Sequence, residues 1–227
     1  MRMTIGNVGK ASYAEFAGKR KLLIIPYVTP TRDHADLLSM VETYWQDAID
    51  QVTKLEVGLG DVRHLFHEGS VGEADDAMDI LQQGNPLGYQ HLRAMIDGGA
   101  TLEPTEDVEA LKETLDLHRC ITVVQVSRSV LERLLEWFEE SRIRRYAAIA
   151  KRVDEHLPKN AVGVLVISPD HEVSFADDIE VVYVVPPVLD RISTWMRDNP
   201  MEAVVDAEET PVQPPGGGDD TPGWAKQ

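Results

Sequence analysis

The sequence is poor in cysteine, in aromatic residues and in positive charge, and each shortage narrows the range of functions. Cys120 is the only cysteine in 227 residues, which excludes an intramolecular disulfide framework and a cysteine-rich zinc knuckle. Aromatic residues make up 6% of a chain that is 43% hydrophobic, so we expect an aliphatic core. The 39 acidic and 22 basic side chains give a formal net charge of −17, which offers no general attraction for phosphates. We therefore expect a protein of the reducing cytoplasm without a nucleic-acid partner.

Several well-known sequence signals are also missing. The N-terminus lacks the apolar core of a secretory signal, and no stretch approaches the roughly 20 apolar residues of a membrane helix. We therefore expect neither export nor a membrane span. The sequence contains no G-x-x-x-x-G-K-[ST], no G-x-G-x-x-G after a strand, no G-x-S-x-G and no H-E-x-x-H. These absences remove the most recognisable nucleotide-binding, hydrolase and zincin signatures.

What the sequence does contain is an alternation of strand-like and helix-like segments. Apolar runs such as LLIIPYV, GVLVISPDH and IEVVYVVPP resemble buried strands, and amphipathic segments with helical spacing separate most of them. The pattern predicts a single α/β domain over residues 19–197 with a mostly parallel central sheet flanked by helices. The last two strands could form a hairpin. The short run ITVVQV (121–126) fits a strand or a helix, and the helical spacing that follows it favours a helix.

The two ends of the chain differ from this domain. Residues 1–18 show no periodicity and are predicted to form a flexible arm. Residues 198–227 are rich in proline, glycine and acidic side chains, which predicts a disordered acidic tail. Trp224 within that tail could be a short docking element for a protein partner, although an incidental placement is the simpler interpretation.

Polar residues that follow strands are the first candidates for a site, because ligands of open α/β sheets bind at the carboxyl ends of the strands. Glu68 and His171 each follow a predicted strand, and we predict that they form an acid–base pair. Together with His67 they could instead hold a divalent metal ion, since carboxylate and imidazole donors suit such ions. The competing interpretations are a solvated acid at the end of a strand and a hydrogen-bonded histidine in a loop.

Arg145 is predicted to point inward from a helix, because it lies one turn before Ile149 on the apolar face. An inward guanidinium needs an anionic partner, which could be a buried carboxylate or a bound anionic substrate. Glu106 and Asp107 are expected to begin a helix, where negative charge is favourable. Cys120 has no general base that the sequence can identify, so we expect an inert thiol.

Four short motifs resemble the TraB, Tiki, ChaN and erythromycin-esterase-like grouping over roughly residues 22–185. FHEG resembles its strand-end glutamate motif, with Glu68 as the carboxylate, and GGATLEPTED resembles the segment in which a strand leads to an acid. The helix motif of that grouping is matched by the stretch that begins at Arg145, and VLVISPDH ends at His171 as its final strand does. The departure lies in the first strand, LLIIPYVTP, which supplies no acid or histidine before Asp33 and His34.

These observations lead to two functional hypotheses. The first is a hydrolase-like α/β protein that acts on a small-molecule or peptide substrate, with Glu68 and His171 in acid–base or metal-binding roles and Arg145 orienting an anion or a carbonyl group. The second is a noncatalytic interaction or regulatory protein whose residues 198–227 recruit a partner. The sequence leaves the cofactor open, with a divalent metal ion as the one candidate that these side chains suggest.

Overall fold

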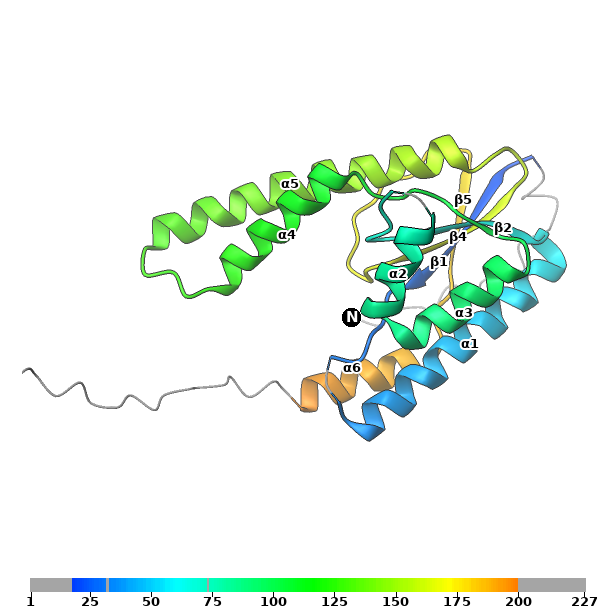
Figure 1. Cartoon of the computed structure of the whole chain (residues 1–227), viewed down its shortest axis with the longest axis horizontal. Coiled ribbons are helices and arrows are strands. Elements are labelled where there is room, and N and C mark those ends of the chain that lie inside the picture. Colours follow the sequence, from blue (N-terminus) through cyan, green and yellow to red (C-terminus); the bar gives the residue numbers. More distant parts are fainter. Residues whose placement is uncertain (1–17, 32, 73, 200–227) are drawn as a thin grey trace, which may run out of the picture.

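A computed structural model describes residues 18–31, 33–72 and 74–199 of the chain (Figure 1). The predicted flexible arm therefore lies outside the described residues, apart from Gly18. The predicted acidic tail, including Trp224, also lies outside them, apart from Asp198 and Asn199. Within the described ranges, no helix combines the length and the apolar character that a membrane crossing requires.

The described residues form a sheet of five parallel strands in the order β3-β2-β4-β1-β5. The strands are β1 (Arg20–Pro26), β2 (Val62–His67), β3 (Thr101–Leu102), β4 (Val162–Ile167) and β5 (Ile179–Tyr183). The predicted mostly parallel sheet is confirmed. The hairpin alternative is wrong, because β1 lies between β4 and β5 and pairs in parallel with both. The connection between β4 and β5 instead packs Val173 and Phe175 against the sheet, which buries apolar surface that a tight turn would not.

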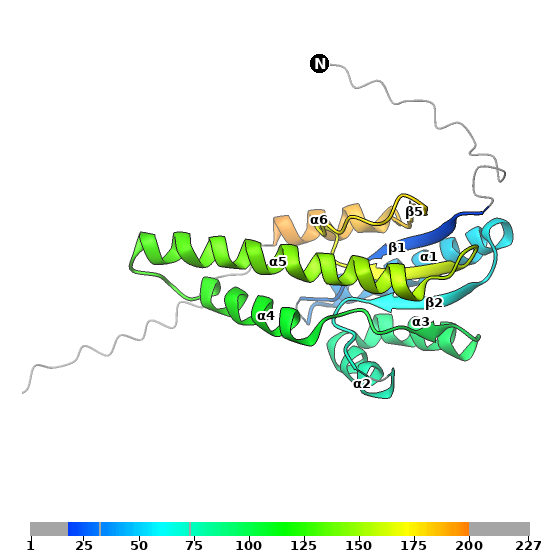
Figure 2. The same ribbon diagram turned by 90° about the horizontal axis from the view of Figure 1, so that it is seen from above.

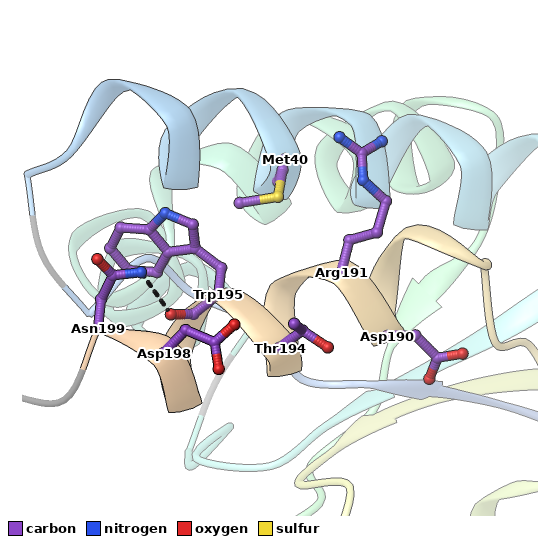
Figure 3. Close-up of a pocket in the computed structure, with 7 residues that line it drawn as sticks. All are labelled: Met40, Asp190, Arg191, Thr194, Trp195, Asp198 and Asn199. Atoms are coloured by element: carbon purple, nitrogen blue, oxygen red, sulfur yellow. Dashed lines mark hydrogen bonds between the residues drawn. The ribbon is translucent and has the colours of Figure 1, made fainter.

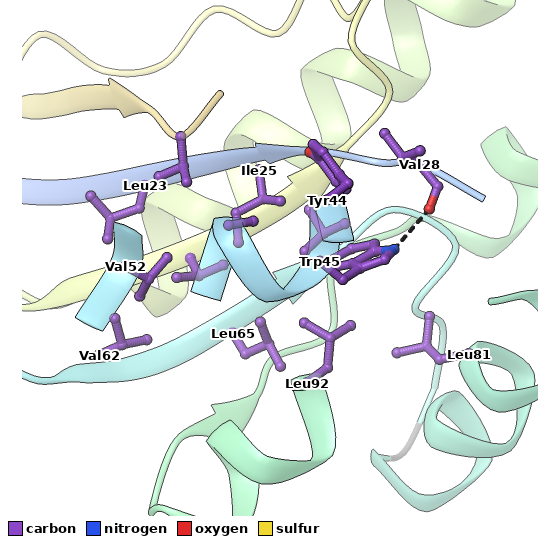
Figure 4. Close-up of a cluster of buried hydrophobic side chains, with 14 of the residues drawn as sticks. Leu23, Ile25, Val28, Tyr44, Trp45, Val52, Val62, Leu65, Leu81 and Leu92 are labelled. Atoms are coloured by element: carbon purple, nitrogen blue, oxygen red, sulfur yellow. Dashed lines mark hydrogen bonds between the residues drawn. The ribbon is translucent and has the colours of Figure 1, made fainter. Parts of the chain in front are cut away.

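Helices cover both faces of the sheet, as predicted (Figures 1 and 2). One face carries α1 (Ala35–Leu59), α2 (Ala74–Gly84), α3 (Pro86–Asp97) and α6 (Val188–Asp198). Its core contains the fully buried Tyr44 and Trp45 (Figure 4). Tyr44 Oη also donates a hydrogen bond to the carbonyl of Pro26, the last residue of β1, at 2.6 Å, and Trp45 Nε1 donates to the carbonyl of Val28, just after the strand, at 3.0 Å. These two side chains of α1 thereby fix the position of the carboxyl end of β1.

The other face is covered by the C-terminal half of α5 (Arg128–His156), which packs Tyr146, Ile149 and Val153 onto the sheet. The N-terminal half of α5 pairs with α4 (Val108–Thr122), and this helical hairpin extends beyond the sheet (Figures 1 and 2).

The helix predicted over residues 121–126 is correct for Ile121 and Thr122 and wrong for residues 123–126, because α4 ends at Thr122 and a non-helical segment separates it from α5. Gln125 Nε2 donates to the carbonyls of Cys120 and Val123, both at 2.8 Å, and so provides partners for carbonyl groups that the end of a helix leaves unpaired. Val124 is 91% exposed in this segment, so the run of valines does not mark a buried element.

Candidate functional site

The candidate site lies where the chain leaves two neighbouring strands in opposite directions. β2 and β4 are adjacent, but β2 leads to β3 on one side of the pair and β4 leads to β5 on the other. Such a switch point opens a crevice at the carboxyl ends of the two strands. Glu68 follows β2 and Ser168 follows β4, and the Ser168 hydroxyl donates a hydrogen bond to Glu68 Oε1 at 2.6 Å. The pair therefore bridges the crevice in which α/β proteins commonly bind their ligands.

Glu68 occupies an unusual environment for a carboxylate. Its side chain is only 10% exposed, and Oε2 is buried without a hydrogen-bond partner among the described residues. Arg145 Nη2 lies 3.6 Å from that oxygen, which is a weak contact. Burial raises the pKa of Glu68 because it disfavours the charged form, while the hydrogen bond from Ser168 and the charge of Arg145 oppose the increase.

Arg145 has a buried carboxylate as its main partner. Its Nε donates to both oxygens of Glu106, at 3.0 and 3.1 Å, and its Nη2 donates to Oε1 of the same carboxylate. The Glu106 side chain is 0% exposed and also accepts a hydrogen bond from the backbone N–H of Gly69 at 3.1 Å. Of the two partners that the sequence left open for Arg145, the structure supplies the buried carboxylate. The helix begins later than expected, at Val108, with Asp107 as its N-cap and Glu106 before it.

His67 and Tyr27 lie next to this group. The Nδ1–H of His67 donates to the carbonyl of Glu68, which fixes the tautomer and leaves Nε2 as an acceptor. Burial lowers the pKa of His67 to about 4, so the ring is neutral at neutral pH. The ring of Tyr27 meets that of His67 edge-on at 5.2 Å. Burial and the charge of Glu68 raise the pKa of Tyr27, so its hydroxyl remains a hydrogen-bond donor.

These side chains line a cavity of about 430 Å³, a size within the range of small-molecule sites. Its polar lining consists of Tyr27, His67, Glu68, Arg145 and Ser168. Its apolar lining comes from the segment after β2 and from α2 and α4, and comprises Val71, Ile80, Leu81, Leu111 and Leu115. A ligand in this cavity would contact one polar and one apolar surface.

His171 lies elsewhere. Its ring stacks on Tyr183 with centroids 6.1 Å apart, its Nδ1 accepts from the N–H of Val173 at 3.3 Å, and it does not line the cavity. The structure therefore brings Glu68, His67 and Arg145 together but shows no contact between Glu68 and His171 within the described residues. No group of three or more His, Cys, Asp or Glu side chains in those residues is placed to hold a metal ion.

Two polar residues of the cavity, Ser168 and Tyr27, were not predicted from the sequence. Both are the first residue after a strand, β4 and β1 respectively, so the rule that selected Glu68 also applies to them. The sequence did not single them out because Tyr27 and Ser168 lie within the runs LLIIPYV and GVLVISPDH, whose ends cannot be located to the residue from the pattern alone.

A second cavity of about 430 Å³ lies between α1 and α6 (Figure 3). Its lining consists of Met40, Asp190, Arg191, Thr194, Trp195, Asp198 and Asn199. Its charged side chains, Asp190, Arg191 and Asp198, are all exposed. The cavity at the switch point is the stronger candidate because its polar groups are removed from water.

Comparison with family models, with curated proteins and with solved structures finds no match for this chain. The function must therefore be inferred from the geometry of the cavity.

Proposed function

We propose that the protein is a hydrolase and that Glu68 is its acid–base group. The observation that carries this proposal is the buried carboxyl group in the wall of the cavity, with one oxygen held by Ser168 and the other without a hydrogen-bond partner among the described residues. A carboxyl group whose pKa is raised above its ordinary value is a stronger base than an exposed carboxylate, and once protonated it can donate the proton again. Hydrolysis needs both steps, one for attack and one for departure of the leaving group.

The unpartnered oxygen argues against a purely structural role. Leaving a buried acceptor without a hydrogen bond costs about 1–3 kcal/mol, and more when the group is charged. Glu68 Oε2 is such an acceptor, and a structural role would be better served by a fully paired or apolar side chain. Folded proteins tolerate local costs of this kind mainly where a ligand or a reaction requires them.

Arg145 acts in this proposal through Glu68 and Glu106. The charge of Arg145 is already matched by Glu106, and with Glu68 ionised the three side chains carry one excess negative charge. The cavity should therefore favour neutral or cationic substrates over anionic ones, and the role of Arg145 is to position Glu68 and to limit the rise of its pKa.

The resemblance to the TraB and erythromycin-esterase-like grouping is compatible with this proposal. Two of its motifs supply Glu68 and Arg145, which line the cavity, and the GGATLEPTED segment contains Glu106, the buried partner of Arg145. His171, from the fourth motif, lies outside the cavity, so we propose a divergent member of that grouping in which this histidine has no catalytic part.

The test is hydrolysis of chromogenic esters, amides, glycosides and phosphate esters by the full-length protein and by Glu68→Gln. Proton transfer by one side chain contributes about 10²- to 10⁴-fold, so kcat/KM should fall by that factor while the melting temperature is retained. Glu103→Gln is the matched control, because Glu103 follows β3 and is also largely buried but pairs with His64 at 2.8 Å. Undiminished hydrolysis in Glu68→Gln, or no hydrolysis of any substrate by the wild type, would refute the proposal. The second result would favour a noncatalytic protein that recruits a partner through residues 198–227.

A further inference from the structure

Ser168 has the surroundings of an activated nucleophile. Its hydroxyl donates to Glu68 Oε1 at 2.6 Å and it lines the cavity. A serine attacks efficiently when an adjacent base accepts its proton, and the base must lie within hydrogen-bond distance. Glu68 meets that condition, and it is the group that the proposed function already uses as an acid and a base.

The backbone of Ser168 is fixed on both sides. Pro169 follows it directly and disfavours the helical region for the residue before a proline. The carbonyl of Ser168 accepts the N–H of His171 at 3.1 Å, which closes a turn. β4 precedes it in the middle of the sheet. A nucleophile needs such constraints, because small displacements of a reacting atom reduce the rate strongly.

A comparison with Ser141 shows that a bond to a carboxylate is not sufficient. Ser141 Oγ donates to Glu113 Oε2 at 3.3 Å, but Ser141 is completely buried between α4 and α5, where Thr114 also contacts it. It does not line the cavity, so no substrate could reach it. Ser168 combines the carboxylate with access to the cavity.

Tyr27 can supply the donor that an acyl-transfer reaction requires for its developing oxyanion. It follows β1, the strand next to β4, and lines the same cavity. Its hydroxyl has no hydrogen-bond partner among the described residues, so it is available to a substrate carbonyl oxygen. Donors of this kind contribute by stabilising negative charge that appears only in the transition state.

The apolar lining indicates the class of substrate. Leu111 and Leu115 from α4 line the cavity together with Ile80 and Leu81 from α2. An aliphatic or aromatic group would be removed from water there, and each buried methylene should strengthen binding about fourfold. The excess negative charge near Glu68 disfavours a carboxylate on the substrate.

We propose that Ser168 is the nucleophile and that the substrates are neutral carboxylic esters with an aliphatic or aromatic group, which rests on the proposed hydrolase function. Ser168 Oγ bonds to the carbonyl carbon while its proton passes to Glu68. The bond to the alcohol oxygen then breaks, and Glu68 returns the proton to that oxygen, so the alcohol leaves and Ser168 carries the acyl group. Water then attacks the acyl carbon while Glu68 takes one of its protons. The bond between the acyl carbon and Ser168 Oγ breaks, Glu68 returns the proton to Oγ, and the carboxylic acid is released.

The test combines covalent labelling with kinetics on the full-length protein. Diisopropyl fluorophosphate should transfer its phosphoryl group to Ser168 with loss of HF, and mass spectrometry of peptides locates the label. p-Nitrophenyl butyrate should give a burst of nitrophenol and be preferred over the mono-p-nitrophenyl ester of succinic acid, which carries a carboxylate. Ser168→Ala should abolish both label and burst, and Glu68→Gln should slow both by about 10²- to 10⁴-fold. Ser174→Ala, an exposed serine in the connection between β4 and β5, should behave as the wild type.

Each other result overturns part of the inference. If Ser168→Ala keeps the hydrolysis that Glu68→Gln loses and no label is found, Glu68 activates water directly, so the nucleophile is refuted while the proposed function stands. A label on another residue also refutes the nucleophile. A preference for the succinate ester refutes the substrate class alone. Absence of both label and hydrolysis refutes the inference together with the proposed function. Circular dichroism of each variant confirms that it is folded.

Discussion

The buried ion pair between Arg145 and Glu106 should be the most sensitive single contact near the site. Glu106 is completely buried and receives two donors from Arg145, whose side chain is 13% exposed. Glu106→Gln retains the size of the side chain but leaves the guanidinium without its main counter-charge. Removing one partner of a buried pair costs about 3–5 kcal/mol. For a domain of this size each kcal/mol lowers the melting temperature by about 2–4 °C, so we expect a decrease of about 6–20 °C.

Differential scanning calorimetry and urea unfolding measure this loss. The control is Glu109→Gln on the same helix, because Glu109 is 84% exposed and pairs with Lys112 in water. Exposed pairs contribute little, so this variant should unfold as the wild type does. The double variant Glu106→Gln/Arg145→Met should recover part of the loss, since the guanidinium that lacks its main counter-charge is also removed. If Glu106→Gln is no less stable than Glu109→Gln, the pair does not stabilise the fold and the assignment of Arg145 as a positioning residue fails.

Three further predictions follow from other contacts. The pKa of His67 is lowered from 6.5 to about 4, so its neutral form stabilises the fold above pH 6.5 and that contribution, about 3 kcal/mol, is lost as the pH falls to about 4. His67→Asn should therefore lose less stability than the wild type between pH 7 and pH 4 in urea unfolding. Gly88→Ala should cost about 1–3 kcal/mol, because an added Cβ would lie 2.7 Å from the buried ring of Trp45, and thermal unfolding measures this loss. Zn²⁺, Mn²⁺, Mg²⁺, Ni²⁺ and Fe²⁺ can be added to metal-stripped wild type, Glu68→Ala and His171→Ala. We expect no ion to raise the melting temperature of the wild type through a site that needs both side chains, because no cluster of metal-binding side chains is found among the described residues.

Each of these predictions has a control and a contradicting result. His118→Asn, at an exposed position, should keep the wild-type loss on acidification, and an equal loss in His67→Asn would contradict the first prediction. Gly84→Ala should be tolerated, because a Cβ added at Gly84 would lie 3.8 Å from its nearest neighbour, Tyr27 Oη, which is an ordinary contact distance. A Gly88→Ala protein as stable as the wild type would contradict the packing around Trp45. An ion-specific rise that both variants abolish would restore the metal hypothesis.

The sequence by itself determined the class of fold and the edge of the sheet at which to search for a site. Both depend on local patterns, because buried β-branched runs define strands and the spacing of apolar residues defines helices. The position of Glu68 directly after β2 could be predicted for the same reason. The local pattern was insufficient for residues 123–126, where valines occupy an exposed non-helical segment that depends on the side chain of Gln125.

Only the tertiary structure decided which residues meet at the site. Glu68 and Ser168 are 100 positions apart, and Arg145 and Glu106 are 39 apart. These contacts depend on β4 lying between β2 and β1, an order that periodicity does not encode because each strand has the same local pattern wherever it pairs. The same order separates Glu68 from His171, since the chain turns directly after Ser168 and packs His171 against Tyr183. The raised pKa of Glu68 is likewise a tertiary property, because it results from burial beneath segments that are distant in the sequence.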